Sequence, residues 1–398
     1  MGRGGYGVVY EVALIEDPKQ RFACKAEKMD NKNSLQVEWK LMSILKEKGS
    51  KHALQGVEIG RHVGVNFIVM DLLGPTLSDL RRRTTSRTLT LFSTTVVAIQ
   101  MFDAIREIHD VGYVHRDVKP SNFAIGLLGS SKEIIVHIID FGISRNIYKI
   151  TDGAKQLRKP RKRVPFRGTM QYCSLNVHNR VDQGPHDDLW SWLYTTVELL
   201  LGDLPWHGLE QEQTRLAKAA RQDELLEKCP EELRFIRGHL DALAINKAPL
   251  YEEIRETLAS IFFKNKFTWE MKLDWQAGGK HEESFHHISH KPSSTEGPVE
   301  LLKILNLPQQ AREITENRLT VVVELFDIPS SVSETDDTVA APESVPEVEP
   351  PKPTKQPKMG PPKTPLRKSK STSNQFKLVK KVGRHRPSQQ KKTKQTKR

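Results

Sequence analysis

The most informative stretch of the sequence is His115-Arg116-Asp117-Val118-Lys119-Pro120-Ser121-Asn122. An aspartate can orient a hydroxyl group and take its proton, and an amide oxygen five residues further on can hold a metal ion that neutralises phosphate charge. Lys119, two residues after Asp117, would place a cation beside the same group. The spacing therefore suits the chemistry of phosphoryl transfer. The alternative is a polar loop between a helix and a strand that has no chemical role.

A second motif follows at a distance that supports the first. Residues 134–139 form a short apolar run typical of a strand, and Asp140-Phe141-Gly142 comes directly after it. We expect Asp140 to bind the Mg²⁺ that bridges phosphates and Phe141 to pack beneath the helix that carries Glu38. Asn122 and Asp140 would then share a metal site from the two sides of a hairpin. The two motifs together are far rarer by chance than either one alone.

Upstream of these motifs lies a lysine that could hold phosphates. Lys25 ends the tetrapeptide Phe22-Ala23-Cys24-Lys25, and Glu38 follows thirteen residues later. Residues 7–14 and 21–27 alternate like paired strands, whereas residues 34–48 have the apolar spacing of a helix. We predict that Lys25 binds the α- and β-phosphates and that Glu38 fixes its ammonium group through an ion pair. Glu27 is the less favoured partner because it shares the strand of Lys25.

The chain opens with Gly2-Arg3-Gly4-Gly5-Tyr6-Gly7-Val8-Val9, which matches the pattern G-x-G-x-x-G-x-V. The glycines of this pattern would let backbone N–H groups close over phosphates, and Val9 would cover the adenine. Because the pattern begins at residue 2, the strand that should lead into it is missing. We favour an incomplete gene product over a protein that binds nucleotide poorly, since the other motifs are intact.

Together these motifs make the first 275 or so residues resemble a eukaryotic protein kinase domain. Residues 72–77, Leu-Leu-Gly-Pro-Thr-Leu, resemble the hinge of the casein kinase I group. Ser174-Leu175-Asn176 stands where most kinases carry Ala-Pro-Glu, a replacement characteristic of that group. Within the group the chain is most similar to the tau-tubulin kinases, over residues 115–126, 166–169, 186–191 and 204–206.

The resemblance implies a fold, an activity and a set of residue roles. The fold would be α+β, the bilobal protein kinase fold with a small β-rich N-lobe and a larger helical C-lobe. The activity would be ATP- and Mg²⁺-dependent phosphorylation of serine or threonine in proteins, with Asp117 and Lys119 catalytic and Thr169 holding both. Mg²⁺ would bind Asn122 and Asp140. ATP would contact Gly2, Gly4, Gly7, Val9, Ala23, Lys25, Glu38, Met70 and Leu72.

Two further features bear on the substrate and on the catalytic loop. Basic residues crowd the region 158–167, and the substrate-binding candidates there are Arg158, Arg161, Arg163 and Arg167. Beside a phosphoryl-transfer site this run favours acidic or already phosphorylated proteins, as in the casein kinase I group. The alternative is a solvated charged surface. Asp188 begins a helix expected over residues 190–201, and it would anchor the catalytic loop or act as the helix N-cap.

Charge is distributed unevenly along the chain. The 398 residues include 62 Lys+Arg and 49 Asp+Glu, a formal net charge of +13. Residues 351–398 contain 17 of the basic residues and no acidic one, so the first 350 residues sum to −4, and residues 331–350 contain six acids and no base. We predict a kinase domain over residues 1–275 and an extension over 276–330, ordered in part at most, with apolar patches at 299–307 and 319–328. Residues 331–398 are predicted to be a disordered tail.

Composition also bears on location and partners. No run of 18 apolar residues occurs, so no membrane span is expected, and Cys24, Cys173 and Cys229 lack metal-ligand spacing. These features fit an intracellular protein of the cytoplasm, the nucleus or both. The tail has Phe376 as its only aromatic residue, which disfavours nucleic acid. Acidic tubulin tails or other cytoskeletal proteins, membrane phosphates and a nuclear import receptor suit its charge equally well. The alternative function is a pseudokinase or scaffold whose tail binds an anionic partner such as tubulin or nucleic acid.

Overall fold

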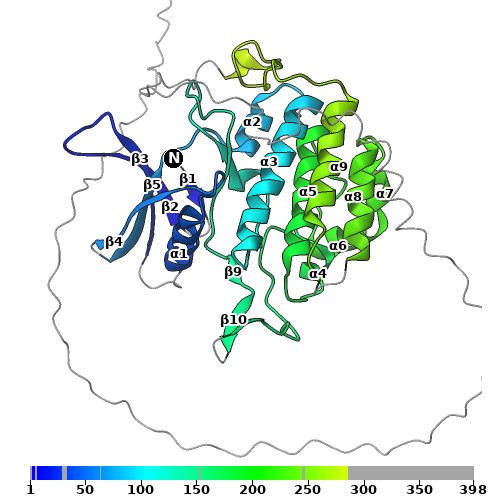
Figure 1. Cartoon of the computed structure of the whole chain (residues 1–398), viewed down its shortest axis with the longest axis horizontal. Coiled ribbons are helices and arrows are strands. Elements are labelled where there is room, and N and C mark those ends of the chain that lie inside the picture. The colour runs from blue at the N-terminus through cyan, green and yellow to red at the C-terminus, as the bar shows by residue number, and fades with distance from the viewer. Residues whose placement is uncertain are drawn as a thin grey trace, which may run out of the picture. The chain divides into compact units, whose positions relative to one another are not determined.

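The computed structural model of the chain describes residues 2–4, 7–28, 34–62, 64–151, 154–243 and 247–285. These residues form a strand-rich lobe followed along the chain by a helix-rich lobe (Figure 1). The predicted α+β fold with a β-rich N-lobe and a helical C-lobe is confirmed. The predicted patches at 299–307 and 319–328 and the predicted tail over 331–398 lie outside the described residues.

The N-lobe is built on one antiparallel sheet and one helix. The sheet has the strand order β1-β2-β3-β5-β4. Helix α1 (Ser34–Glu47) presents its apolar positions to the core, since Leu35, Leu41, Met42 and Leu45 are buried at the spacing of one helix face. The strands are β1 (Gly2–Gly4), β2 (Gly7–Ala13), β3 (Arg21–Lys28), β4 (Gly56–His62) and β5 (Val65–Asp71).

The glycine-rich pattern lies within this sheet. Strand β1 pairs with β2 so that Gly4 faces Gly7, and residues 5 and 6 between them lie outside the described residues. Gly7 has a φ of 154°, and a Cβ atom there would stand 2.4 Å from the carbonyl oxygen of Ala26 on β3. Only glycine fits at this position. Gly2–Gly4, the first residues of the pattern, form a three-residue strand.

The C-lobe is organised around two long buried helices, α3 (Leu91–Asp110) and α5 (Pro185–Leu201), which lie side by side in Figure 1. The indole N–H of Trp192 on α5 donates to the carbonyl of Ala98 on α3 at 3.0 Å. The helices predicted over 94–109 and 190–201 are therefore confirmed, and both begin earlier than predicted. The other C-lobe helices are α2 (Leu77–Arg83), α4 (Leu175–His178), α6 (Gln211–Ala220), α7 (Gln222–Leu226), α8 (Glu231–Ala242) and α9 (Tyr251–Lys264).

Short paired strands and a 3₁₀ turn flank the loops that hold the predicted site residues. Strand β7 (Phe123–Ile125) pairs with β8 (Val136–Ile138), and the 3₁₀ turn η1 (Pro120–Asn122) precedes β7. Because Phe123 faces Ile138, this pairing brings Asn122 and Asp140 to the same end of a hairpin, as predicted. The strand β6 (Tyr113–Val114) pairs with β9 (Arg145–Asn146), and β10 (Tyr148–Thr151) pairs with β11 (Ala154–Leu157).

Two predictions about the chain as a whole can be compared with the described residues. Among them, no helix is both long and apolar enough to cross a membrane. Cys24, Cys173 and Cys229 are all free thiols, and Cys24 and Cys173 are buried. The three cysteines thus form no disulfide.

Candidate active site

Lys25 of β3 lies between two carboxylates that come from different parts of the chain. Its Nζ atom is 2.7 Å from Glu38 Oε2 on α1 and 2.7 Å from Asp140 Oδ1 after β8. Strand β3 points Lys25 toward α1 because alternate residues of a strand face opposite sides of the sheet. The predicted ion pair with Glu38 is present, and the contact with Asp140 adds a link between the two lobes. Glu27, the less favoured candidate, bonds to Ser34 Oγ and the backbone N–H of Leu35 instead.

The electrostatics of this cluster follow from burial and pairing. Burial by itself would lower the pKa of Lys25, but the carboxylates of Glu38 and Asp140 raise it above its ordinary value. Burial raises the pKa of Glu38, and Lys25 offsets part of that rise. Burial would also raise the pKa of Asp140, yet the charge and hydrogen bond of Lys25 bring it below its ordinary value. Lys25 and Asp140 are thus both held in their charged forms.

The residues after β8 turn sharply so that Phe141 enters the core. Asp140 has a positive φ of 66°, which is uncommon for a residue with a side chain. Phe141 is fully buried, and its ring meets the ring of His115 edge-on at a centroid distance of 5.6 Å. Phe141 therefore links Asp140 to the catalytic loop through its ring and to Glu38 of α1 through its backbone N–H.

Three polar side chains, two from the catalytic loop and one from residue 169, surround the Asp117 carboxylate. Lys119 Nζ is 2.8 Å from Asp117 Oδ2, and Asn122 Nδ2 donates to the same oxygen at 3.2 Å and to the Asp117 carbonyl at 2.9 Å. The Thr169 hydroxyl donates to Asp117 Oδ1 at 2.7 Å and accepts from Lys119 Nζ at 2.9 Å. The four residues predicted from the sequence to act together are in contact.

Asp188 of α5 anchors the backbone of this loop. Its carboxylate accepts from the backbone N–H groups of His115 at 2.7 Å and Arg116 at 2.8 Å, and from His109 Nε2 at 3.0 Å. Burial would raise the pKa of Asp188, but these hydrogen bonds and the two histidines lower it. Asp188 is not the N-cap of α5, which was the alternative for it. The N-cap is Gly184, and its backbone N–H donates to the carboxylate of Asp187, in the first turn of the helix, at 2.8 Å. His109 was not predicted from the sequence.

Gly168 allows the substrate-side loop, residues 166–173, to approach the catalytic loop, residues 115–122. Gly168 has a φ of 116°, and a Cβ atom at this position would lie 2.7 Å from the Arg116 carbonyl oxygen. Any side chain here would push the following residue, Thr169, away from Asp117. The stretch 166–169 was predicted to matter by resemblance, and the close approach of the two backbones gives the physical reason.

The residues predicted to contact the adenine of ATP lie in the core of the N-lobe or pack against it. Ala23 on β3 faces Met70 on β5, and Val9 on β2 faces Lys25. Ala23 and Met70 are buried, while Val9 and Leu72 are partly buried and pack against the same core. These side chains offer an apolar surface next to the Lys25 cluster. Such a surface suits a flat heterocycle.

The activation segment, residues 158–176, begins with a basic run whose charge is partly neutralised by a residue that the sequence did not reveal. Asp182 accepts from Arg161 Nη2 at 2.9 Å and from Arg145 Nη1 at 3.0 Å. Burial would raise the pKa of Asp182, but the hydrogen bonds of Arg161 lower it, with a further contribution from Arg145. Of the four candidate arginines, Arg161 is therefore engaged internally. Its pairing depends on residues 21 positions away, so no local pattern could have indicated it.

The remaining candidate arginines differ in their surroundings. Arg158 Nε donates to the Tyr148 carbonyl at 2.9 Å at the base of the β10–β11 hairpin. Arg163 and Arg167 are exposed. Burial, together with the nearby like charges of Arg167, Arg145 and Arg161, lowers the pKa of Arg116 to about 10. The segment thus places a concentration of positive charge beside the catalytic loop.

Ser174 and Asn176, the residues that stand in place of Ala-Pro-Glu, have a common partner. Ser174 Oγ donates to Asp187 Oδ1 at 2.5 Å, and Asn176 Nδ2 donates to the same oxygen at 3.1 Å. Asp187 is at the start of α5, so the two polar residues fasten the end of the activation segment to the central helix of the C-lobe. This contact explains why the replacement motif pairs a hydroxyl with an amide.

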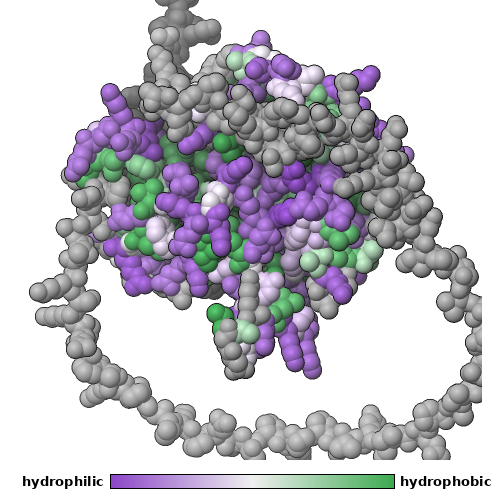
Figure 2. Space-filling view, in the orientation of Figure 1, coloured by the Kyte–Doolittle hydropathy of each residue, from purple (hydrophilic) through white to green (hydrophobic). Residues whose placement is uncertain are grey.

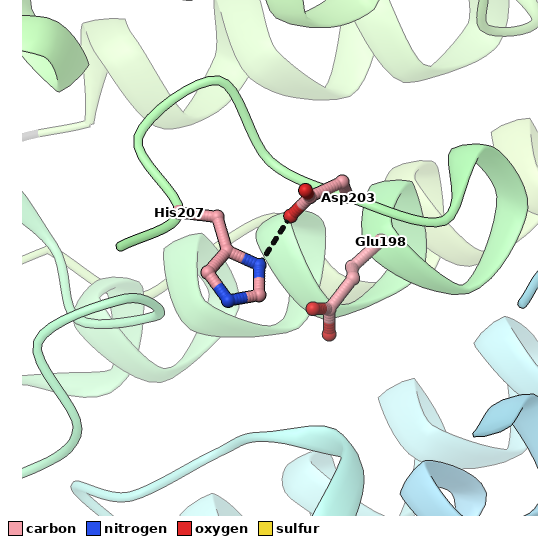
Figure 3. A group of neighbouring side chains, drawn as sticks. All are labelled: Glu198, Asp203 and His207. Carbon is pink, nitrogen blue, oxygen red and sulfur yellow. Dashed lines mark hydrogen bonds and ion pairs between the residues drawn. The ribbon is translucent and has the colours of Figure 1, made fainter. Parts of the chain in front are cut away.

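A second group of potential metal ligands lies at the end of α5. Glu198, Asp203 and His207 each place a ligand atom within 4.8 Å of the others (Figure 3). Glu198 already accepts from Tyr172 at 2.7 Å and from Gln171 at 3.0 Å, and Asp203 lies 2.5 Å from His207 Nδ1. We assign this group a structural function, because the Glu198 oxygens are occupied in holding residues 171–172.

Matches with known proteins agree with this geometry. The family model described as the protein kinase domain matches residues 1–262. A probable serine/threonine-protein kinase of Dictyostelium discoideum is 33% identical over 278 residues, which are 69% of this chain and 55% of that protein. The serine/threonine-protein kinase spe-6 of Caenorhabditis elegans is 30% identical over 282 residues, 69% of this chain and 73% of that protein. A Caenorhabditis elegans protein named as a putative casein kinase I is 35% identical over 215 residues, which are 53% of this chain and 61% of that protein.

The chain belongs to the protein kinase family, because the family model covers more than half of it. It is a protein serine/threonine kinase, the class to which these relatives belong. The resemblance to protein kinases is confirmed, and one relative bears the casein kinase I name. The closer placement with the tau-tubulin kinases stays a prediction.

Proposed function

We propose that the protein transfers the γ-phosphoryl group of ATP to serine or threonine hydroxyls of proteins, with Mg²⁺ as cofactor and with a preference for acidic or already phosphorylated substrates. The observation that carries this proposal is the Asp117 carboxylate, oriented by Lys119, Asn122 and Thr169 together. An aspartate held in this way can take the proton of a substrate hydroxyl. The hydroxyl oxygen bonds to the γ-phosphorus as ADP leaves.

The Lys25 cluster supports the nucleotide part of the proposal. An ammonium group has three N–H donors, and Lys25 uses two of them on Glu38 and Asp140. The third donor is available for a phosphate oxygen. Gly7 supports the same part, because its backbone lies where no side chain fits. The glycines Gly2, Gly4 and Gly7, with Val9, Ala23, Met70 and Leu72, would complete the ATP site.

The donor set also fits Mg²⁺, which prefers oxygen ligands. Asp140 has a lowered pKa and is ionised at neutral pH. Asn122 uses its amide nitrogen on Asp117, which leaves its amide oxygen free to face the metal. When bound, Mg²⁺ would neutralise charge on the β- and γ-phosphates. Asn122 and Asp140 would hold it, while Lys119 would act beside the transferred group.

The proposed preference for acidic substrates rests on the activation segment. A cavity of about 180 Å³ at the base of the β10–β11 hairpin is lined by residues that include Arg145, Arg158, Asp182 and Lys247. The β10–β11 hairpin projects from the lobe in Figure 1. Figure 2 shows both hydrophilic and hydrophobic surface on this projecting part of the molecule. The Ile150 side chain on β10 is 80% exposed. Exposed cations beside a phosphoryl-transfer site attract phosphate and carboxylate groups.

The activity is tested by comparing the wild-type chain with Asp117→Asn in the presence of ATP, Mg²⁺ and casein. Asn cannot act as a base, so phosphate incorporation should fall by about 100-fold or more. Asp110→Asn is the matched control, because the Asp110 side chain is 63% exposed at the end of α3. Equal incorporation by wild type and Asp117→Asn would overturn the proposal.

The substrate preference is tested separately with serine peptides that have acidic, phosphorylated or neutral flanking residues. Arg163→Gln and Arg167→Gln should raise KM for the first two peptides and weaken the dependence of that KM on salt, because each removes an exposed charge. The exposed Lys228 gives the control variant Lys228→Gln. Unchanged KM values for all three peptides would exclude a substrate-binding function for these arginines.

The finer grouping and the domain boundaries belong to the same proposal. The hydrogen bonds of Ser174 and Asn176 to Asp187 support membership of the casein kinase I group. The placement with the tau-tubulin kinases rests on residues 115–126, 166–169, 186–191 and 204–206, and tubulin or cytoskeletal proteins are the corresponding candidate partners. We place the kinase domain at residues 1–275, an extension at 276–330 and an acidic then basic tail at 331–398.

The competing function, a pseudokinase or scaffold, predicts no thermal shift with ATP and Mg²⁺. A kinase that binds ATP at 100 times its Kd would instead gain about 2.7 kcal/mol of stability.

A further inference from the structure

Lys218 of α6 is fully buried, which is rare for a lysine. Its Nζ atom donates to two backbone carbonyls of the substrate-side loop, Met170 O at 2.9 Å and Cys173 O. It also lies over the rings of Tyr194 and Trp206, 5.0 and 5.5 Å from their centroids. These four groups surround the ammonium on the interior side of the loop.

No carboxylate among the described residues forms an ion pair with Lys218. Its charge is instead stabilised by carbonyl dipoles and aromatic faces, and burial lowers the pKa of Lys218 to about 8. Burying a cation without a counter-ion is costly, and a methionine or leucine would fill the same space without that cost. The buried ammonium therefore has a function that an apolar side chain would not provide, and the two carbonyls show what it does: it holds the loop.

The loop that Lys218 holds carries the residue that orients the catalytic base. Thr169, one residue before Met170, donates to Asp117 Oδ1 and accepts from Lys119. The indole N–H of Trp206 donates to the intervening carbonyl of Gln171 at 2.8 Å. Three carbonyls of residues 170–173 are thus held from the α6 side, two by Lys218 and one by the Trp206 ring over which Lys218 lies.

We propose that Lys218 is a positioning residue for protein phosphorylation: it holds residues 170–173 so that Thr169 stays on Asp117 and the loop presents a fixed surface to the protein substrate. It touches neither the reacting atoms nor the nucleotide-side cluster of Lys25, Glu38 and Asp140. This inference rests on the proposed functions of Asp117 and Thr169. It predicts an effect on the protein substrate that is separable from nucleotide binding.

The test uses the full chain and the variant Lys218→Met, which keeps the length of the side chain and removes its charge and donors. We expect kcat/KM for casein to fall by about 10-fold or more, since a displacement of about 1 Å at a reacting geometry can cost 100-fold. KM for ATP and the thermal shift with ATP and Mg²⁺ should stay within about 2-fold of wild type. Hydrogen exchange should rise at the amides of residues 170–174 and stay unchanged at residues 115–125.

Lys228→Met is the control, because Lys228 is exposed in the same region and loses the same charge. If Lys218→Met does not fold, Lys218→Gln is measured by the same criteria, since its amide keeps two donors and its loss should be smaller but equally selective. A fall confined to the protein substrate supports the proposal. An equal loss of kcat/KM for casein and of ATP binding, or no loss of either, overturns it. An inactive wild-type chain would instead refute the proposed function itself, so the two failures are distinguishable.

Discussion

The Thr169 hydroxyl donates a 2.7 Å hydrogen bond to the Asp117 carboxylate, although the two residues are 52 positions apart in the sequence. The same hydroxyl accepts from Lys119, so one side chain of the activation segment sets the geometry of two residues of the catalytic loop. Gly168 makes the contact possible, because a Cβ atom at that position would meet the Arg116 carbonyl at 2.7 Å. Correct placement of the activation segment is thus a condition for a correctly oriented base.

We expect Thr169→Val to lower kcat for protein substrate by about 10- to 100-fold, because a hydrogen bond to a charged group is worth about 1.5–3 kcal/mol. Thr169→Ser keeps the hydroxyl and should retain most of the activity. Steady-state kinetics with casein, and KM for ATP as the internal control, provide the measurement. If valine and serine were equally active, the hydroxyl would have no part in orienting Asp117.

Lys25→Met should destabilise the fold by about 3–5 kcal/mol, because it leaves the buried Glu38 carboxylate without its cation. The double variant Lys25→Met/Glu38→Gln should recover part of that loss, since the buried charge is then also removed. Urea unfolding at pH 7 measures both free energies. A double variant less stable than Lys25→Met would contradict this account of the cluster. Neither variant should bind ATP as tightly as wild type.

The ion pairs of Asp182 with Arg145 and Arg161 should protect the activation segment from proteases. Asp182→Asn removes the ion pairs with Arg145 and Arg161, so trypsin should cut within residues 158–163 about 10-fold faster under conditions where opening is rapid. Asp241→Asn removes an ion pair with Arg237 on α8 and serves as the control. Cleavage at the wild-type rate would show that the segment is held by other contacts.

The Asp188 carboxylate should contribute stability that depends on pH in a defined direction. Its pKa in the folded chain is below the ordinary 3.8, so the contribution is complete above pH 3.8 and is lost as the pH falls through the lower folded value. Asp188→Asn should therefore cost about 3 kcal/mol at pH 7, and this cost should shrink between about pH 4 and pH 2.

Urea unfolding across this pH range provides the measurement for Asp188. Asp223→Asn is the matched control, because the Asp223 side chain is 96% exposed. The cost of the Asp223 change should be small at every pH. A cost of Asp188→Asn that grew toward low pH would have the wrong sign for a carboxylate that is stabilised in the folded state.

Local patterns were sufficient where the chemistry depends on short sequence distances. The spacing of Asp117, Lys119 and Asn122 places them on one turn, and the apolar run before Asp140 gives a strand whose hairpin partner begins directly after Asn122. The pair Lys25–Glu38 was also predicted, because a strand and a helix in this register leave few other partners. The helices over 94–109 and 190–201 followed from their apolar spacing, although their starts did not.

Contacts between residues that are far apart in the sequence were not predictable in the same way. Asp182 with Arg145 and Arg161, His109 with Asp188, and Lys218 with the carbonyls of residues 170 and 173 arise only when separate segments pack together. Each involves an ordinary charged residue with no distinctive neighbours. The sequence offered no signal for Lys218 beyond its place within a helix.

The sequence by itself predicted which residues would do the chemistry, because phosphoryl transfer needs a base, a metal-binding amide and a phosphate-binding cation at spacings that strands, loops and a helix can supply. Only the tertiary structure decided how those residues are held. The second contact of Lys25, the capping of α5 by Gly184 and Asp187 rather than Asp188, and the neutralisation of Arg161 depend on burial and on distances between lobes, loops and helices. Burial fixes the strength of each charge interaction, and it is a property of the packed molecule that no local pattern contains.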